Sequence, residues 1–250
     1  MKLIMNCYQC SKENITDEVV LVELNEAGLY QYTCSRGHES EVALQNALFE
    51  VLFDIGAMAL LDGYTREAVV SFTSSLERFY EYYITAISLE NQVSGELFDK
   101  AWKNISRQSE RQYGAFLLLY VHKNRRAPPA LSNKEMKFRN SVVHRGKIPS
   151  TEEAIKYGES IYGLLKNMAL ELKQISPEGV GLANFRRNDL SLRSRKNDVG
   201  LNGMSIKTII DMAYKSDSVT MCETFKDELR SFKAISWTLY KQKQLTMASI

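Results

Sequence analysis

The spacing of apolar residues changes once along the chain. Near the N-terminus, two short β-rich runs at 19–22 and 29–33 are separated by a turn signal at 25–28, which predicts a β-hairpin. From Ser40 onward, apolar residues recur at intervals of three and four, which predicts an amphipathic helix that continues to about Met58. The predicted fold class is therefore mainly α, with a small β region at the N-terminus.

The same helical periodicity continues well beyond this first helix. It predicts five further helices, at 69–87, 94–105, 107–122, 132–146 and 150–175. Ser132 and Glu135 have the spacing of a capping box, and so do Ser150 and Glu153. Because the predicted connections are short, these helices favour an antiparallel bundle, and Pro177 is interpreted as its end.

The two ends of the chain differ in charge. Residues 1–45 carry 3 basic and 7 acidic side chains, whereas residues 180–250 carry 12 basic and 7 acidic ones. Residues 184–196 are predicted to form a flexible basic loop, followed by two helices near 206–213 and 225–239. An acidic head and a basic tail indicate that different surfaces meet different partners.

The composition excludes several classes of protein. An apolar fraction of 44% and a charged fraction of 25% are ordinary for a soluble globular chain of 250 residues. The most apolar long stretch, 42–61, contains Glu50 and Asp54, so we expect no membrane span. No signal-peptide core precedes Cys7, and four cysteines do not make a secreted disulfide framework. We therefore expect a cytoplasmic protein without a membrane partner.

Three of the four cysteines and one histidine form a metal-binding pattern. Cys7 and Cys10 are separated by two residues, and Cys34 and His38 flank a second turn in which Gly37 favours a left-handed backbone. Two knuckles joined by a hairpin are typical of a zinc ribbon, in which four protein ligands fill a tetrahedral shell. The expected cofactor is thus a structural Zn²⁺, whose binding is coupled to folding, with no catalytic metal.

Other interpretations of this pattern remain open at this stage. The cysteines could instead be small buried residues, or the Cys-x-x-Cys pair could be redox-active, although no strand-to-helix junction accompanies it. With the zinc interpretation, the chain divides into three parts. These are a zinc ribbon at 1–41, a helical bundle at 42–179 and a basic C-terminal helical region at 180–250.

The short predicted helix at 132–146 carries the residues best suited to catalysis. Arg139, Asn140 and His144 lie within it, and Asn140 and His144 are about 40° apart on a helix. An imidazole can take a proton from a ribose 2′-hydroxyl, and a guanidinium can stabilise charge on a phosphate. Arg139 is about 140° from His144, so a compact site requires a bend or a second copy of the helix.

At these residues the chain resembles a known family. Residues 42–175 look like a HEPN domain of prokaryotic toxin and antiphage defence systems, whose motif is an Arg followed after four to six residues by a His. The resemblance implies a helical bundle that dimerises and places two motifs in one cleft. It also implies a metal-independent endoribonuclease that works through attack by the 2′-hydroxyl and leaves a 2′,3′-cyclic phosphate and a 5′-hydroxyl. The expected partners are an RNA substrate, a second copy of the chain, and an antitoxin or defence-system partner.

The same residues are also compatible with a protein that is not an enzyme. The alternative to the enzyme is a non-catalytic dimeric module that binds nucleic acid or protein and regulates a toxin–antitoxin or defence system. Arg139 and His144 would then be a charge cluster at a helix C-terminus, where cations are favoured. In the tail, a set of basic residues could contact RNA or belong to a solvated loop: Arg186, Arg187, Arg193, Arg195 and Lys196.

Overall fold

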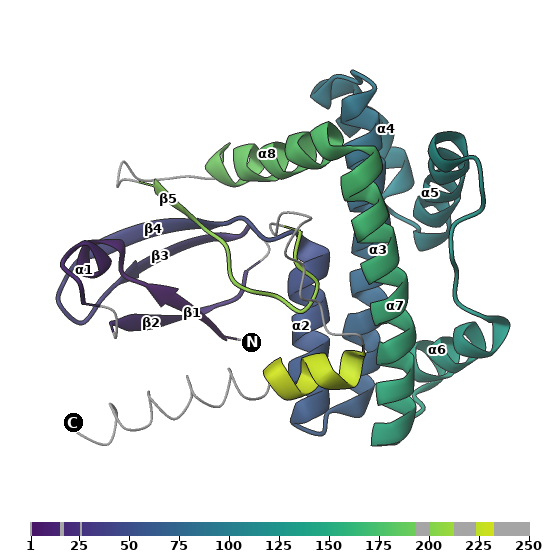
Figure 1. Cartoon of the computed structure of the whole chain (residues 1–250), viewed down its shortest axis with the longest axis horizontal. Helices are drawn as coiled ribbons and strands as arrows, with labels where there is room; N and C mark the ends of the chain where they lie inside the picture. The colour runs from purple at the N-terminus through teal and green to yellow at the C-terminus, as the bar shows by residue number, and fades with distance from the viewer. Residues whose placement is uncertain (1, 16–17, 26, 194–200, 213–223, 233–250) are drawn as a thin grey trace.

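The protein is mainly helical, with its strands on one side of the helical body (Figure 1). A computed structural model describes residues 2–15, 18–25, 27–193, 201–212 and 224–232. Residues 8–12 form the one-turn helix α1 (Tyr8–Lys12). The long helices that follow are α2 (Leu48–Leu61), α3 (Thr65–Glu90), α4 (Gly95–Ile105), α5 (Ser109–Asn124), α6 (Asn133–Arg145), α7 (Thr151–Ile175) and α8 (Pro177–Arg193).

The strands of the described residues form two small sheets. β1 (Lys2–Asn6) pairs antiparallel with β2 (Val19–Glu23). β3 (Leu29–Thr33) pairs antiparallel with β4 (Glu39–Leu44), which also pairs in parallel with β5 (Leu201–Met204). β5 therefore joins a segment from the far end of the sequence to the N-terminal sheet.

The predicted hairpin between the two β-rich runs is wrong. β2 pairs with β1, a strand that the apolar pattern did not predict, while β3 pairs with β4. The first helix also begins later than predicted, at Leu48, because residues 39–44 are a strand. Leu44 matched the helical spacing by coincidence, and its burial comes from a core shared with Leu3 and Tyr32 of the other strands. The division predicted between residues 41 and 42 falls inside β4.

The helical body is built around α3. This helix packs against α2, α5, α6, α7 and α8, and its buried face includes Phe72, Phe79 and Tyr83. Local signals predicted several helix ends correctly. Ser132 and Ser150 form capping boxes at the starts of α6 and α7, and Gly146 ends α6 with a φ of 72°.

The C-terminal part differs from the prediction in two ways. Residues 177–193 form α8 instead of the end of the bundle and a basic loop, because Pro177 occupies the start of a helix, where its missing N–H costs nothing. Residues 205–212 are not helical, whereas 225–232 are helical as predicted. The prediction at residues 233–239 lies outside the described residues.

Buried polar groups explain the extended backbone before residue 213. The Asn46 side chain donates to the carbonyl of Ile206 and accepts from its N–H, at 2.9 and 2.8 Å. The N–H groups of Ile209 and Met212 donate to Asp54 and Glu50, at 3.1 and 2.7 Å. These contacts hold the segment against α2, and they outweigh its local helical periodicity.

Within the described residues, no helix combines the length and the apolar character needed to cross a membrane.

Candidate functional site

The first half of the Cys/His cluster is a single helical turn that follows β1. Cys7 occupies the N-cap of α1, and Cys10 lies one turn later in the same helix. The N–H of Ser11 donates to the Cys7 carbonyl at 3.0 Å, which closes the turn. Both cysteine side chains are fully buried, and their sulfur atoms lie within 4.8 Å of one another.

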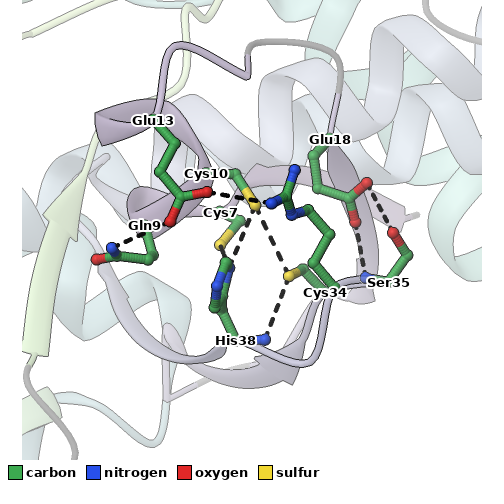
Figure 2. A network of polar contacts seen from close by, with 9 residues as sticks. Cys7, Gln9, Cys10, Glu13, Glu18, Cys34, Ser35 and His38 are labelled. Carbon is green, nitrogen blue, oxygen red and sulfur yellow. Dashed lines mark hydrogen bonds and ion pairs between the residues drawn. The ribbon is translucent and has the colours of Figure 1, made fainter.

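The second half of the cluster is the tight turn between β3 and β4. The N–H of Gly37 donates to the Cys34 carbonyl at 3.0 Å, and Gly37 has the left-handed φ of 84° that the sequence predicted. The N–H of His38 donates to Cys34 Sγ at 3.4 Å. Glu18 accepts hydrogen bonds from both the backbone and the hydroxyl of Ser35, which anchors this turn (Figure 2).

The four predicted ligands converge on one point (Figure 2). All of their ligand atoms lie within 4.8 Å of one another. Cys10 Sγ is 3.9 Å from Cys34 Sγ and 3.3 Å from His38 Nδ1, and Cys7 Sγ is 3.7 Å from His38 Nδ1. A tetrahedral zinc ion with its usual bond lengths separates two sulfurs by about 3.8 Å and sulfur from nitrogen by about 3.6 Å.

The electrostatics of the cluster also fit a bound cation. Burial raises the pKa of the Cys10 thiol to about 12, and the neighbouring thiols of Cys7 and Cys34 add to this. Burial acts in the same direction on Cys7, but hydrogen bonds from Cys10, His38 and Cys34 lower its pKa to about 7. Three buried thiols cannot all ionise without a compensating positive charge. The cluster could therefore hold a metal ion such as zinc, with every ligand supplied by the protein.

The three predicted catalytic residues all lie on α6, but not on one face of it. Asn140 and His144 are exposed, whereas Arg139 is half-buried. Their positions agree with the angular separation expected for a straight helix. Within one chain, the structure therefore brings Asn140 and His144 to the same surface and turns Arg139 away from them.

Arg139 lies on the side of α6 that faces Tyr80 of α3 and Tyr157 of α7. Its positive charge acts on the hydroxyls of Tyr80 and Tyr157, where it opposes the increase in pKa that burial causes; the pKa of Tyr157 is nevertheless raised to about 12. Tyr157 also shares a hydrogen bond of 2.9 Å with Thr73. Arg139 Nε is buried and has no hydrogen-bond partner in the described part of the chain. A buried donor without a hydrogen-bond partner lowers the stability of the folded state.

The basic residues of the tail are not all available to a ligand. Arg186 forms an ion pair with Asp99 of α4 and lies over the Phe98 ring, with its guanidinium carbon 5.3 Å from the ring centre. Burial lowers the pKa of Arg187, and the negative charge of Glu50 opposes this decrease. The backbone of Arg193 ends α8, and Arg195 and Lys196 lie outside the described residues.

A polar cavity of about 150 Å³ lies where β4, α2, α8 and the 205–212 segment meet. Its lining is rich in amides and includes Gln45, Asn46, Glu50, Asn184, Asn188, Ser205 and Met212. The sequence pattern did not predict this cavity. The presence of Glu50 and Asp54 inside an apolar stretch is the feature that could have indicated it, because buried carboxyl groups require hydrogen-bond donors around them.

Comparisons of the chain with known protein families, with curated proteins and with solved structures find no match.

Proposed function

We propose that the protein is a metal-independent endoribonuclease of the HEPN type. In this proposal it acts as a homodimer and serves as a toxin or an antiphage defence effector. The observation that carries the proposal is the pairing of His144 and Asn140 on the exposed face of α6. An exposed imidazole beside a polar amide can reach a ribose 2′-hydroxyl, which a buried histidine cannot do.

The proposed reaction needs one base and one group that stabilises negative charge. His144 takes the proton of the 2′-hydroxyl, and the 2′-oxygen bonds to phosphorus while the bond from phosphorus to the 5′-oxygen breaks. The 5′-oxygen takes a proton from solvent. Arg139 holds the phosphate oxygens, on which charge increases during the reaction. The products are a 2′,3′-cyclic phosphate and a 5′-hydroxyl.

A second copy of the chain supplies the contact that one helix lacks. Met136 is 40% exposed and lies about 60° from Arg139 and 80° from His144 around α6, between the two. Further large apolar side chains are exposed nearby in sequence, at Ile148 just after α6 and at Leu118 and Val121 of α5. If these side chains form one contiguous apolar patch, that patch favours a protein–protein contact. A partner helix over Met136 reaches the sides of α6 that carry Arg139 and His144.

In the same proposal, the Cys/His cluster binds zinc for a structural purpose. All four ligands come from the protein, which is typical of structural sites. The ion would fix the two turns relative to β1 and β4, and β4 in turn pairs with β5. The antitoxin or defence-system partner that the family resemblance implies belongs to this proposal too.

The test is cleavage of total RNA by the purified protein, compared with the His144→Ala variant. The wild type should cleave RNA without added magnesium, and the variant should be slower by about 100-fold or more. The variant should melt like the wild type, because His144 is exposed. Light scattering at micromolar concentration should show a dimer. RNA cleavage that is unchanged in the variant would refute the assignment.

In the non-catalytic alternative the protein is still a dimer, but it does not cleave RNA. This alternative is favoured by the position of Arg139, which is half-buried and whose charge acts on the buried hydroxyls of Tyr80 and Tyr157. Under this alternative, wild-type protein binds RNA or a partner protein, but it cleaves no RNA under any condition or with any partner.

A further inference from the structure

We infer that the outer face of α6 is an RNA-binding surface, on which Lys134, Lys137 and Arg145 hold phosphates of the strand beside His144. This inference rests on the proposed function and names its binding surface. It replaces the basic tail as the main place of RNA contact.

The charge of α6 is strongly unbalanced. Residues 133–145 contain four Lys or Arg residues and one acidic residue, Glu135. Glu135 does not neutralise the outer face, because its carboxylate accepts hydrogen bonds from Ser132 and Ser160 on the inner side of the helix. Partial burial raises the pKa of Glu135, but these hydrogen bonds outweigh it and lower the pKa. The carboxylate therefore stays ionised and is engaged by the two serines.

The cations of the outer face lack the ion pairs that three other cations of the helical body make. Lys123 pairs with Glu90 at 2.5 Å, Arg126 with Glu171 at 2.6 Å and Lys147 with Glu153 at 2.5 Å. By contrast, three cations of α6 are exposed and have no ion pair within the described part of the chain: Lys134, Lys137 and Arg145. Unpaired cations gathered on one helix form a site for a polyanion.

The arrangement places this charge beside the proposed base. Lys137 and His144 are seven residues apart, which puts them about 20° apart around the helix and about 10 Å apart along it. Asn140 lies between them on the same exposed stripe. Lys134 and Arg145 lie near the two ends of α6, both on one side of this stripe and about 80° and 100° from His144 around the helix. A single strand that follows the stripe therefore brings a phosphodiester next to His144.

The helix α4 provides a matched control. It also presents two exposed lysines, Lys100 and Lys103, but Glu96 lies one turn before Lys100 in the same helix, whereas Asp99 is paired with Arg186. Charge reversal of two lysines there changes the net charge of the protein by the same amount as reversal on α6. Lys134→Glu should not weaken α6, because the first turn of a helix favours acidic residues.

The experiment measures binding of a 2′-O-methyl single-stranded RNA, which lacks the nucleophilic hydroxyl and cannot be cleaved by the proposed route. Fluorescence anisotropy at several salt concentrations compares the wild type with Lys134→Glu/Lys137→Glu and with Lys100→Glu/Lys103→Glu. Cleavage of unmodified RNA is measured in parallel. We expect at least a tenfold loss of affinity for the α6 variant and less than a twofold change for the α4 variant. With Lys134→Gln/Lys137→Gln, the slope of log affinity against log salt should shrink by about 1.4.

The possible outcomes separate this inference from the proposed function. If the α6 variant loses binding but wild-type protein never cleaves unmodified RNA, the surface is supported and the nuclease proposal fails. If wild-type protein cleaves RNA and the α6 variant binds and cleaves as well as the wild type, the surface is refuted and the nuclease proposal stands. Equal losses in the α6 and α4 variants would also refute it, because binding would then follow net charge alone. Failure of wild-type protein to bind the RNA would do the same.

Discussion

The Cys/His cluster and the α6 motif were both predicted from short sequence patterns, yet the fold treats them differently. The cluster brings together Cys7, Cys10, Cys34 and His38 from two turns and places their ligand atoms within 4.8 Å. The motif on α6 keeps Arg139 half-buried, while Asn140 and His144 are exposed. Turns can bend to meet at one point, whereas a helix fixes the angle between its side chains. The first motif is therefore complete within one chain, whereas the second keeps Arg139 away from His144, and our proposal uses a second chain to complete it.

The largest expected effect concerns the motif that is complete. Cys34→Ser should reduce zinc from one ion per chain to nearly none, because three remaining ligands leave an open tetrahedral site. The region before α2 should lose its protection from proteolysis, while the helices keep theirs. Cys222→Ser serves as the matched control, since Cys222 lies outside the pattern and should leave the zinc content unchanged. Freshly purified wild-type protein without zinc would contradict this prediction.

The next effect concerns the incomplete motif. Arg139→Lys should slow RNA cleavage by about 100-fold, because an ammonium group lacks the planar fork that holds two phosphate oxygens. The same exchange at exposed Arg107, between α4 and α5, should leave the rate within twofold of the wild type. Rates are compared at equal protein concentration, after melting curves show equal stability. A rate in Arg139→Lys equal to that of the wild type would favour a purely structural role for this residue.

A smaller effect is expected where the sheet region joins the helices. The net pKa of Glu50 is raised to about 7, mainly by burial and to a smaller extent by the charge of Asp211. Two backbone N–H groups and Arg187 oppose this increase. Lys173 also faces this group. A carboxyl with a raised pKa binds its proton more tightly in the folded state than in the unfolded chain. Its contribution to stability is therefore present at low pH and is lost as the pH rises from about 4.5 to about 7.

Glu50→Gln tests this dependence. Between pH 5 and pH 7.5, the free energy of unfolding of the wild type should fall relative to the variant, by up to about 3 kcal/mol. Urea denaturation at the two pH values measures the difference. Glu152→Gln is the control, since Glu152 is exposed in the first turn of α7. Parallel pH profiles for the wild type and Glu50→Gln would contradict the assignment of the raised pKa to Glu50.

The features that sequence predicted are those with local causes. The capping boxes at Ser132 and Ser150, the left-handed Gly37 and the Cys-x-x-Cys spacing each depend on a few neighbouring residues, and the structure confirms them. The position of Arg139 against Tyr157 was not predicted, because it depends on how α6 docks on α3 and α7. For α6, the helical periodicity predicted only the angle between Arg139 and His144 around the helix.

The features that sequence missed depend on distant contacts. β5 pairs with β4 across more than 150 residues, and no local pattern specifies that pairing. The backbone at Ile206 and Met212 is held by Asn46 and Glu50, so its apolar spacing could not predict its structure. Pro177 was interpreted as a stop, although proline is equally suited to the first turn of a new helix.

The proposal that two chains complete the site is tested most directly by asking whether two inactive variants recover RNA cleavage when they are mixed. Arg139→Ala and His144→Ala proteins should each cleave RNA at least about 100-fold more slowly than the wild type. After they are mixed in equal amounts and allowed to exchange subunits, half of the dimers contain one of each variant. In those dimers, one site combines an intact Arg139 with an intact His144 from the other chain. We expect the mixture to regain about a quarter of the wild-type cleavage rate. A mixture as inactive as its two components, with subunit exchange shown by labelled chains, would contradict the claim that two chains complete the site.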